Sequence, residues 1–475
     1  AWVSAKNNLV YSVFFLLGLI QYSKFILEGN KKQYVYALLF FILSVLSKPS
    51  AICFPLVLFL LDYLLKSKLD FKSLFINKIP FIIVAAILGF ATIYTRTEDK
   101  FINQNHAYAI HERIGYAGYA ILQYIYKFFI PMDLSVIYPY PQNKTVSIII
   151  GYVVIALLIV GIYKLYKSSS KIIFFGLLFF IVNLLLVLQF IPFGEVLTAD
   201  RYMYLPIIGI SVALLSIFPV KENQLKILGI GIILVFGSLT FMRASVWKNS
   251  ISLYSDIIKK YPHSFVALNS LGAEYMLNKN YDMSLRYLNA AINENTEYYK
   301  GYYNRGLLYA QTDRMKNALR DFDKAIALNQ YPKAYVARAN AYYILKDFPK
   351  AISDAEAVLK TDVNNPKANY VLATCYDDLN QLDKALGYYN KVISINAESP
   401  LYFMRRAILY GKMQQFQMCL QDLDACTNID ANYAEAYYWK GVVKVNMKQN
   451  PCADLRRALD LGFTAAQQPL QTYCR

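Results

Sequence analysis

Hydrophobic residues dominate the first half of the chain in long runs, and polar residues collect in the short segments between them. Eight runs have the composition of helices that cross a bilayer or pack in a bundle of such helices. They are Leu9–Leu27, Tyr34–Leu46, Ala51–Leu65, Ile79–Tyr94, Ser147–Tyr166, Ile172–Ile191, Tyr204–Val220 and Leu225–Met242. The second and third runs are separated by a turn at Pro49, because proline fixes φ and lacks an N–H group.

After about residue 245 the pattern changes to a repeat of 33 or 34 residues. A small residue marks the first helix of each repeat, at Gly272, Gly306, Ala339, Ala373, Ala407 and Gly441. A second small residue marks the second helix, at Ser284, Ala318, Ala351, Ala385, Cys419 and Ala453. An aromatic residue follows the first mark by three positions, at Tyr275, Tyr309, Tyr342, Tyr376 and Tyr410. This period is that of the tetratricopeptide repeat, in which small residues let two helices approach and aromatic residues fill the space between pairs.

The two patterns together predict an all-α chain with two domains. Residues 1–245 are predicted to form a polytopic transmembrane helix bundle. Residues 246–475 are predicted to form an α-solenoid of about six tetratricopeptide repeats.

Lysines cluster in alternate loops of the first half. The clusters are Lys31 and Lys32; Lys66, Lys68, Lys72 and Lys78; Lys164, Lys167 and Lys171; and Lys221 and Lys226. The positive-inside rule puts these loops in the cytoplasm, so residues 95–146, residues 192–203 and everything after Met242 lie on the other side. Gly118–Ile130 would break this alternation as a ninth span, and we expect an interfacial or re-entrant helix there. Asp62, at the cytoplasmic end of a span, is expected to reach the membrane interface.

Composition excludes several classes of protein. The chain has 475 residues, of which 56% are hydrophobic and 17% charged, and this excludes disordered, collagen-like and small disulfide-scaffold proteins. Residues 1–245 carry 21 Lys+Arg against 10 Asp+Glu, whereas residues 246–475 carry 28 against 22. We predict the lipid bilayer as a partner of the first half, and no nucleic acid as a partner of the chain.

Two segments on the predicted outer side carry candidate chemistry. Tyr138 and Tyr140 alternate with prolines that hold an extended backbone, so a sugar or an isoprenoid could stack on their flat rings. Packing in an aromatic belt is the alternative for these two tyrosines. Asp200 and Arg201 lie beside the start of an apolar helix, where charge is costly and marks a functional site. The alternative is that Asp200 and Arg201 anchor the helix at the interface, with Tyr202 and Tyr204 in an aromatic belt.

The repeats carry a second candidate surface, on first-helix positions that line the concave side. Lys300, Lys333 and Lys367 occupy the same position in three consecutive repeats, and Tyr303 and Tyr370 lie on the same face. This pattern is typical of a groove for an extended acidic or aromatic peptide. A solvated lysine face is the alternative interpretation.

The positions of the six cysteines agree with the predicted membrane topology. Cys53 lies in a span and the other five lie in the repeats, on the side where disulfides persist. Cys452 and Cys474 flank the last helices, and a disulfide between them would hold the final repeat in place. The histidines have no metal-ligand spacing, so we predict no metal site.

Several segments together resemble a family of known proteins. They are Ala1–Leu19, Leu46–Tyr63, Pro131–Pro141, Thr198–Ile210 and Val246–Gly272. The likeness covers nearly the whole chain and is to the bacterial relatives of the transmembrane and tetratricopeptide-repeat O-mannosyltransferases. These resemble the GT-C class of polytopic glycosyltransferases, which transfer a sugar from a polyprenyl-phosphate carrier on the non-cytoplasmic side. The resemblance implies a multi-pass protein of the bacterial inner membrane with its repeats in the periplasm.

The resemblance also implies roles for individual residues. The essential acidic residue of GT-C enzymes lies after their first membrane helix, which we expect to precede Ala1, so no catalytic base is assigned. Arg201, positioned by Asp200, would contact the phosphate of the carrier, because guanidinium groups pair bidentately with phosphate oxygens. Lys48 would contact the same phosphate of the carrier. The walls of the sugar or isoprenoid pocket would be formed by Tyr138, Tyr140, Tyr202 and Tyr204. The polyprenyl-phosphate sugar is the donor substrate, and no cofactor is predicted.

Two other functions fit the same sequence. The chain could be a membrane-anchored scaffold whose repeats assemble periplasmic partners and whose bundle has lost activity. It could also be a ligase or polymerase of lipid-linked glycans, with the same donor and a different acceptor.

Overall fold

A computed structural model describes residues 3–65, 71–98, 108–168, 170–188, 190, 196–218 and 222–474. The chain divides into two compact units, Ala1–Ala267 and Leu268–Arg475. The regular structure of the described residues is helical, with one isolated antiparallel bridge between Tyr138 and Thr198.

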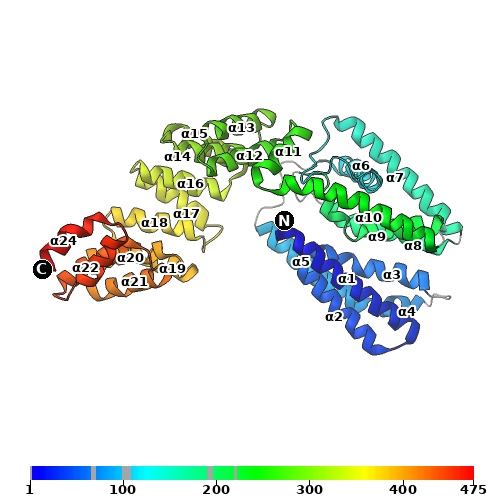
Figure 1. Ribbon diagram of the computed structural model, residues 1–475, viewed down its shortest axis with the longest axis horizontal. Helices are drawn as coiled ribbons and strands as arrows, with labels where there is room; N and C mark the ends of the chain where they lie inside the picture. Colours follow the sequence, from blue (N-terminus) through cyan, green and yellow to red (C-terminus); the bar gives the residue numbers. More distant parts are fainter. Residues whose placement is uncertain are drawn as a thin grey trace. The chain divides into compact units, whose positions relative to one another are not determined.

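The first unit is a set of long apolar helices (Figure 1). Its α-helices are α1 (Val3–Glu28), α2 (Lys31–Ser47), α3 (Phe54–Leu65), α4 (Phe71–Ile76), α5 (Ile79–Glu98), α6 (Ile110–Phe129), α7 (Lys144–Lys167), α8 (Lys171–Leu184), α9 (Pro206–Ile217), α10 (Glu222–Ala244), α11 (Ser250–Lys260) and the start of α12 (Phe265–Leu277). Short 3₁₀ segments are η1 (Pro49–Cys53), η3 (Leu185–Val187), η4 (Asp200–Met203) and η5 (Ser245–Trp247).

The eight predicted apolar runs coincide with helices over their described residues, and helical structure is confirmed for each. Among the described residues, four helices are long and apolar enough to cross a membrane, namely Lys6–Glu28, Leu74–Thr92, Lys144–Lys167 and Lys226–Trp247. The predicted turn before Pro49 is also present. Lys48 is extended, with φ −159°, as expected for a residue whose α conformation would clash with the following proline ring.

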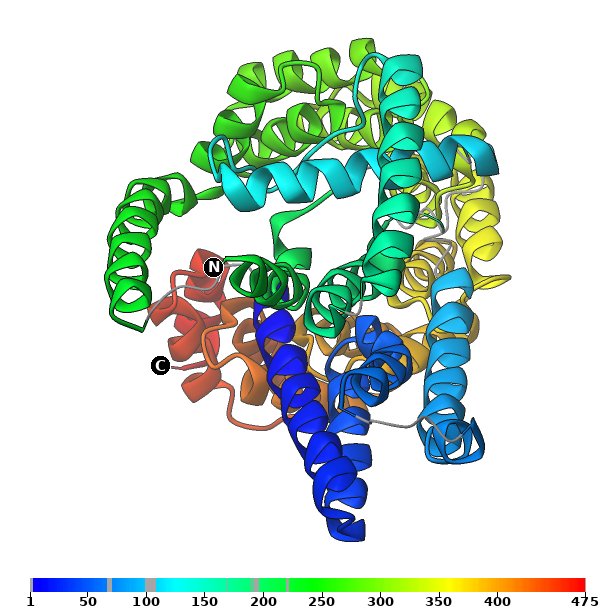
Figure 2. The same ribbon diagram turned by 90° about the vertical axis from the view of Figure 1, so that its right-hand side faces the viewer.

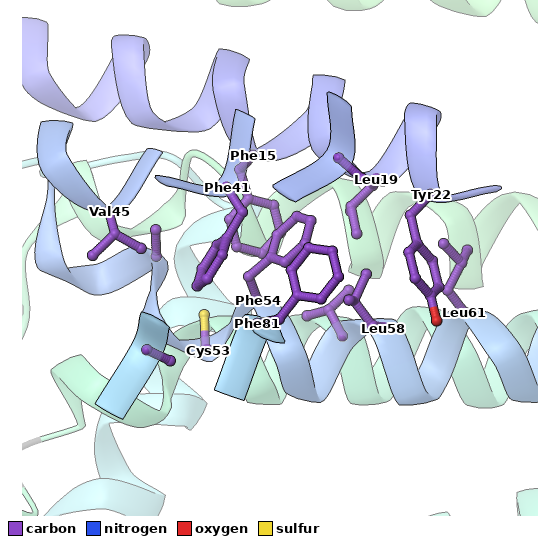
Figure 3. Packing of buried hydrophobic residues seen from close by; sticks show 14 of the residues in the cluster. Phe15, Leu19, Tyr22, Phe41, Val45, Cys53, Phe54, Leu58, Leu61 and Phe81 are labelled. Carbon is purple, nitrogen blue, oxygen red and sulfur yellow. The ribbon is translucent and has the colours of Figure 1, made fainter. Parts of the chain in front are cut away.

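Aromatic rings hold α1, α2, α3 and α5 together (Figure 3). Phe15, Phe41, Phe54 and Phe81 are all fully buried. Phe54 lies at the centre, with its ring centroid 4.8 Å from Phe15, 4.9 Å from Phe41 and 5.8 Å from Phe81. Edge and stacked contacts at these distances add specific attraction to the large apolar area that each ring buries.

Glycines allow other helix pairs of this unit to touch through their backbones. A Cβ on Gly118 of α6 would lie 2.1 Å from the carbonyl oxygen of Gly151 in α7, so no larger residue fits where these helices cross (Figure 2). Gly176 of α8 and Gly209 of α9 make a similar contact, with each glycine 2.5 Å from the other's carbonyl oxygen by the same measure.

Helix α10 differs from the others because none of its candidate span is buried inside the protein. Figure 2 shows it standing apart from the other helices of the first unit. It is apolar on every side, and Phe241 is 82% exposed. A helix of this kind is stable when lipid or another protein covers it.

The first unit continues past the predicted domain boundary at residue 245. Helix α11 packs Leu253 and Ile257 against Val136 and Ile137 of the loop between α6 and α7. These apolar contacts explain why the compact unit extends to Ala267.

The second unit is a row of helix pairs, shown from green to red in Figure 1. From residue 265 to residue 460 the pairs are α12 with α13 (Tyr281–Glu294), α14 (Tyr299–Gln311) with α15 (Met315–Asn329), α16 (Pro332–Ile344) with α17 (Phe348–Leu359), α18 (Pro366–Asp378) with α19 (Leu382–Ile395), α20 (Pro400–Lys412) with α21 (Phe416–Ile429), and α22 (Ala434–Asn446) with α23 (Cys452–Asp460). A 3₁₀ turn, η6 (Thr464–Ala466), and α24 (Gln467–Tyr473) follow.

The small residues of the repeat lie where the two helices of a pair meet. A Cβ on Gly306 would lie 2.6 Å from the Phe322 ring, and Ala339 is fully buried at the equivalent position. The aromatic residue three positions later stacks on a ring of the second helix. Tyr376 and Tyr388 are nearly parallel, with centroids 5.6 Å apart. The predicted packing of the repeat is therefore confirmed.

The prediction that Ala453 is the buried small residue of the last repeat is wrong. Ala453 is exposed, whereas Pro451 is buried at the start of α23. Gly306 meets Phe322 across 16 residues, but Gly441 meets Leu455 across 14, so two fewer residues separate the contacting positions of the last pair. The period of the preceding repeats therefore predicted the buried position at Ala453, two residues after Pro451, where the structure has it.

Ion pairs join the two helices in several repeats. An arginine that precedes the small residue of the first helix binds an aspartate 16 residues later, in Arg305–Asp321, Arg338–Asp354 and Arg406–Asp422. In the last pair Lys444 binds Asp454. At the end of the unit, Cys452 and Cys474 form a disulfide that ties α24 to α23.

A buried ion pair lies inside the first unit, where Asp62 of α3 binds Lys78 at the start of α5. The Lys78 amine also lies 3.0 Å from the hydroxyl of Tyr22 in α1. All three side chains are fully buried, so the expectation that Asp62 reaches the interface is wrong. Its carboxylate is paired inside the bundle instead, because an uncompensated charge there is costly.

Breaking this pair should destabilise the first unit. We expect Asp62→Asn or Lys78→Met alone to cost about 3–5 kcal/mol, because each leaves its partner buried without compensation. The double variant Asp62→Leu with Lys78→Met should recover most of this loss. Thermal unfolding in detergent, followed by circular dichroism, measures the effect, with exposed Lys164→Met as the control. Single variants that melt like the wild type would contradict this role.

Candidate anion site and repeat groove

Two loops of the first unit, one after α6 and one before α9, are joined by backbone hydrogen bonding. The N–H group of Leu197 donates to the carbonyl oxygen of Tyr138 at 2.9 Å, beside the bridge between Tyr138 and Thr198. Ala199 N–H donates to the hydroxyl of Tyr124 in α6 at 3.2 Å. The predicted residues Tyr138 and Asp200, 62 residues apart in sequence, are thereby brought together.

Tyr138 holds Asp200 directly. Its hydroxyl lies 2.8 and 2.9 Å from the two carboxylate oxygens of Asp200, and it accepts a hydrogen bond from Ser135 N–H at 2.8 Å. Because Tyr138 is only 3% exposed, its placement supports a positioning role more than that of a pocket wall. Burial raises the pKa of the Asp200 carboxyl, although the Tyr138 hydroxyl and nearby cations oppose the shift.

Lys48 and Arg201 converge on the ring of Tyr202. The Lys48 amine lies 5.1 Å from the ring centroid, and the Arg201 guanidinium carbon also lies 5.1 Å from it. The Lys48 amine is in addition 5.2 Å from the ring of Tyr11 in α1. Lys48, Arg201 and Tyr202 are all half-buried. Both cations therefore make cation–π contacts with the same ring.

Asn8 of α1 is a member of this site that the sequence did not single out. Its side-chain oxygen accepts a hydrogen bond from the Lys48 amine. Asn8 is 1% exposed, and its side-chain nitrogen has no hydrogen-bond partner. An isolated asparagine among apolar helix residues carries no pattern that predicts this contact.

The other two predicted tyrosines lie in different surroundings. Tyr140 packs its ring 4.9 Å from Tyr108 and 5.1 Å from Tyr116, in a group of three aromatic side chains. Tyr204 follows η4 and is 40% exposed.

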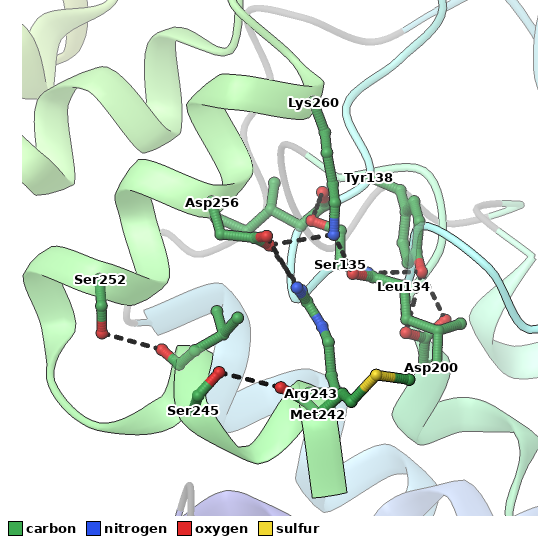
Figure 4. A network of polar contacts seen from close by, with 12 residues as sticks. Leu134, Ser135, Tyr138, Asp200, Met242, Arg243, Ser245, Ser252, Asp256 and Lys260 are labelled. Carbon is green, nitrogen blue, oxygen red and sulfur yellow. Dashed lines mark hydrogen bonds and ion pairs between the residues drawn. The ribbon is translucent and has the colours of Figure 1, made fainter. Parts of the chain in front are cut away.

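A polar network connects the Asp200 loop region to α11 (Figure 4). The guanidinium of Arg243, at the end of α10, donates to both oxygens of Asp256 at 2.7 and 2.6 Å. Lys260 bonds the same carboxylate at 3.1 Å and the carbonyl oxygen of Leu134 at 2.8 Å. Leu134 directly precedes Ser135, whose N–H group binds Tyr138. Sequence reasoning missed this network, because its members are far apart and follow no motif.

The predicted residues of the repeat groove are distributed along the first helices. Lys333 and Lys367 are exposed, and Lys300 is half-buried with its amine 5.6 Å from the Tyr299 ring. Tyr303 packs 5.2 Å from Tyr331, at the start of the next repeat.

The second groove tyrosine lies beside a basic residue that sequence reasoning missed. Tyr370 packs 5.4 Å from Tyr402 of the next repeat, and the positive charge of Arg405 acts on its hydroxyl. The exposed Arg405 adds positive charge to this surface. It carried no sequence signal because the equivalent positions of other repeats hold uncharged residues.

Among the described residues, no group of three or more His, Cys, Asp and Glu side chains is arranged to hold a metal ion.

The matches to a known protein family lie in the second unit. Residues 299–331 and 342–408 match the tetratricopeptide repeat family. Over 114 residues the chain is 26% identical to the Hsp70-Hsp90 organizing protein of Triticum aestivum, covering 24% of this chain and 20% of that protein. Over 109 residues it is 31% identical to serine/threonine-protein phosphatase 5 of Rattus norvegicus, covering 23% of this chain and 22% of that protein.

A tetratricopeptide repeat protein of known structure from Parabacteroides merdae is 18% identical, with a TM-score of 0.40. The match covers 51% of this chain and 98% of that one. The chain spans about a fifth of the length of the two curated relatives above. The second unit thus consists of tetratricopeptide repeats, a class of domain that presents a surface for protein partners.

The Asp256 pair should make stability depend on pH. Burial alone would raise the pKa of Asp256, but hydrogen bonds from Arg243 and Lys260 outweigh it and lower the pKa below the ordinary 3.8. Its contribution is therefore present above pH 3.8 and is lost as the pH falls through the lowered value. We expect Asp256→Asn to cost about 1–2 kcal/mol at pH 7.

Thermal unfolding of the wild type and of Asp256→Asn between pH 7 and pH 2 measures this difference. The two melting curves should converge at the acid end. Asp133→Asn, at an exposed aspartate in the neighbouring loop, is the control. A difference that stays constant over the whole range would exclude the ion pair as its source.

Proposed function

We propose that the protein is a membrane glycosyltransferase that moves a sugar from a polyprenyl-phosphate carrier to an acceptor on the non-cytoplasmic side. The observation that carries this proposal is the convergence of Lys48 and Arg201 on Tyr202. Cations that lie partly buried beside apolar helices suit a ligand with a charged phosphate and a greasy tail. The sequence resemblance to GT-C enzymes supports the same donor.

The chemistry of the reaction defines what these residues would do. An acceptor hydroxyl, such as that of a protein side chain, attacks the anomeric carbon of the sugar and passes its proton to a carboxylate base. The bond between the anomeric carbon and the phosphate oxygen breaks, and its electron pair stays on the phosphate. Lys48 and Arg201 would stabilise the charge that grows on this leaving group. Asp200, held by Tyr138, would position the η4 segment that carries Arg201.

The repeats would bind the acceptor protein or a partner in the same compartment. A bound acceptor then stays near the membrane at a high effective concentration. The positive charges of the groove favour an acidic segment, because opposite potentials attract. We place the protein in a bacterial inner membrane, with the repeats in the periplasm, on the evidence of the lysine loops and the resemblance.

A scaffold that assembles periplasmic proteins is the second candidate. The match of residues 299–331 and 342–408 to tetratricopeptide repeats favours it, because such repeats serve protein interaction without any chemistry. This candidate needs the bundle only as an anchor. Variants at Lys48 and Arg201 therefore distinguish the two functions.

Loss of either cation should abolish sugar transfer. We expect Arg201→Ala and Lys48→Met to lower transfer about 10²–10³-fold, as when one charge-stabilising donor is removed from an active site. The measurement is intact-mass glycoproteomics of exported proteins in a deletion strain that expresses each variant. Lys144→Met is the control, since Lys144 is 50% exposed and pairs with Glu112. Normal hexose levels with Arg201→Ala at normal expression would remove Arg201 from the donor site.

Reversing the charge of the groove should weaken the binding of an acidic ligand. We expect the triple variant of Lys300, Lys333 and Lys367 to Glu to bind a fluorescent Glu- and Tyr-rich peptide at least about tenfold more weakly, with the largest difference at low salt. Fluorescence anisotropy at two salt concentrations measures this loss.

The repeats offer a matched control for that measurement. Lys316, Lys350 and Lys384 recur with the same period on the second helices and are all exposed. Changing them to Glu alters the net charge equally and should leave binding nearly intact. Equal losses in both triple variants would identify the lysines of the groove as a solvated face.

A further inference from the structure

The loop between α6 and α7 contains a residue with a left-handed backbone. Asp133 has φ +53°, a conformation that is unfavourable for residues with a Cβ, although aspartate tolerates it better than most. Asp133 is exposed, but the chain is buried two residues later, from Ser135 to Tyr138. Backbone of this kind persists only where its surroundings hold it, and it clusters at functional sites. The turn at Asp133 therefore needs a physical support.

Two lysine amines hold the carbonyl groups on either side of this turn. Lys127, in the last turn of α6, donates to the carbonyl oxygen of Met132 at 3.4 Å. Lys260, in the last turn of α11, donates to the carbonyl oxygen of Leu134 at 2.8 Å (Figure 4). Two helices that are far apart in the sequence thus grip the residues before and after the turn. We call these two lysines and two carbonyl groups the lysine clamp.

The clamped segment fixes the hydroxyl of Tyr138. The N–H group of Ser135, which directly follows Leu134, donates to this hydroxyl at 2.8 Å. A hydroxyl that accepts this bond still has its own hydrogen to donate, and Asp200 accepts it at 2.8 Å. The Lys127 amine also lies 4.7 Å from the centroid of the Tyr138 ring, so one lysine contacts both the turn and the ring.

Helix α11 brings Lys260 to the turn. Ile257 is fully buried in the same apolar cluster as Val136, so the helix is packed against the segment that it holds. Asp256, one helical turn before Lys260, binds its amine at 3.1 Å and limits the directions in which that amine can point. The support of the turn thus comes in part from a helix that follows the last predicted span.

We propose that the lysine clamp positions the donor site: it holds the turn at Asp133 and so directs the Tyr138 hydroxyl to Asp200. This inference rests on the proposed function, in which Asp200 positions the segment that carries Arg201. The two lysines are positioning residues, because they act through Tyr138 and not on the carrier or the sugar. A site of this kind loses activity when its supporting residues allow it to move.

Amide hydrogen exchange measures the order of this region without reference to sugar transfer. The whole chain in phosphatidylcholine nanodiscs is compared with its variants over residues 134–138 and 196–203. Lys260→Met should raise exchange in both segments at least about tenfold, because the Leu197 N–H group is bonded to the Tyr138 carbonyl oxygen and opens with it. Unchanged exchange in residues 196–203 would overturn the inference.

Two further variants of α11 serve as comparisons. Lys260→Arg keeps a charged donor and should bring exchange back to within about threefold of the wild type. Lys259→Met is the matched control, because Lys259 is the exposed neighbour on the same helix. Exchange that rises equally with Lys259→Met would assign the effect to a general loosening of α11 and contradict a role of the clamp.

A second-site variant separates the clamp from general support of the fold. Asp133→Gly removes the penalty of the left-handed turn, because glycine adopts positive φ readily. Combined with Lys260→Met, it should lower the exchange of residues 196–203 at least about threefold from that of the single variant. Asp133 does not lie on α11, so it cannot repair a helix that has only become loose. No recovery in the double variant would therefore count against the clamp.

Sugar transfer distinguishes this inference from the function on which it rests, and intact-mass glycoproteomics of exported proteins in a deletion strain measures it. Lys260→Met should lower transfer about tenfold, whereas Lys260→Arg should stay near the wild type. If Lys260→Met transfers normally and Arg201→Ala does not, the clamp does not position the site, while the proposed function stands. If both transfer normally although exchange rises with Lys260→Met, the proposed function falls, and the clamp still positions Asp200.

Discussion

Charge inside an apolar helix bundle must be compensated, and this constraint organises the first unit. Removing an ion from water costs several kcal/mol unless an opposite charge or several hydrogen bonds replace the solvent. Asp62 and Lys78 satisfy the constraint by pairing with each other, fully buried between α3 and α5. Asp200 satisfies it through the Tyr138 hydroxyl, and Arg243 through Asp256. Each polar contact fixes the position of a loop or helix end, and the apolar contacts around it supply most of the stabilisation.

The second unit follows a different constraint, the stacking of helix pairs that cannot bury their apolar faces alone. Small residues such as Gly306 set the distance within a pair, and rings such as Tyr303 fill the space between pairs. The repeated small and aromatic residues are used in packing. The surface for a partner therefore consists of exposed first-helix residues such as Lys333, which recur with the same period. The first unit thus holds a small charged site, and the second an extended surface. The proposed function would use both features.

The sequence predicted the helices and the repeat packing, because both depend on patterns that recur along the chain. Apolar runs give the helices of the first unit, and one period of 34 residues locates the small and aromatic residues of the second. Ala453 was misplaced because two fewer residues separate the contacting positions of the last pair, where the period fails. Lys48 and Arg201 could be suggested as a pair by resemblance, but their meeting at Tyr202 depends on tertiary structure. Asn8, Asp256 and Arg405 carried no signal, since a single polar residue on a helix has no periodicity.

The central claim is that the Arg201 site and the repeats face the same aqueous space, and sidedness is measured most directly by cysteine labelling. The native thiols interfere little, because Cys53, Cys375, Cys419 and Cys426 are buried and the other two form a disulfide. A membrane-impermeant maleimide added to whole spheroplasts should label Lys333→Cys in the repeats and Gln142→Cys in the outer loop. It should leave Lys32→Cys unlabelled until the membrane is opened. Labelling of Lys333→Cys only together with Lys32→Cys would contradict the account.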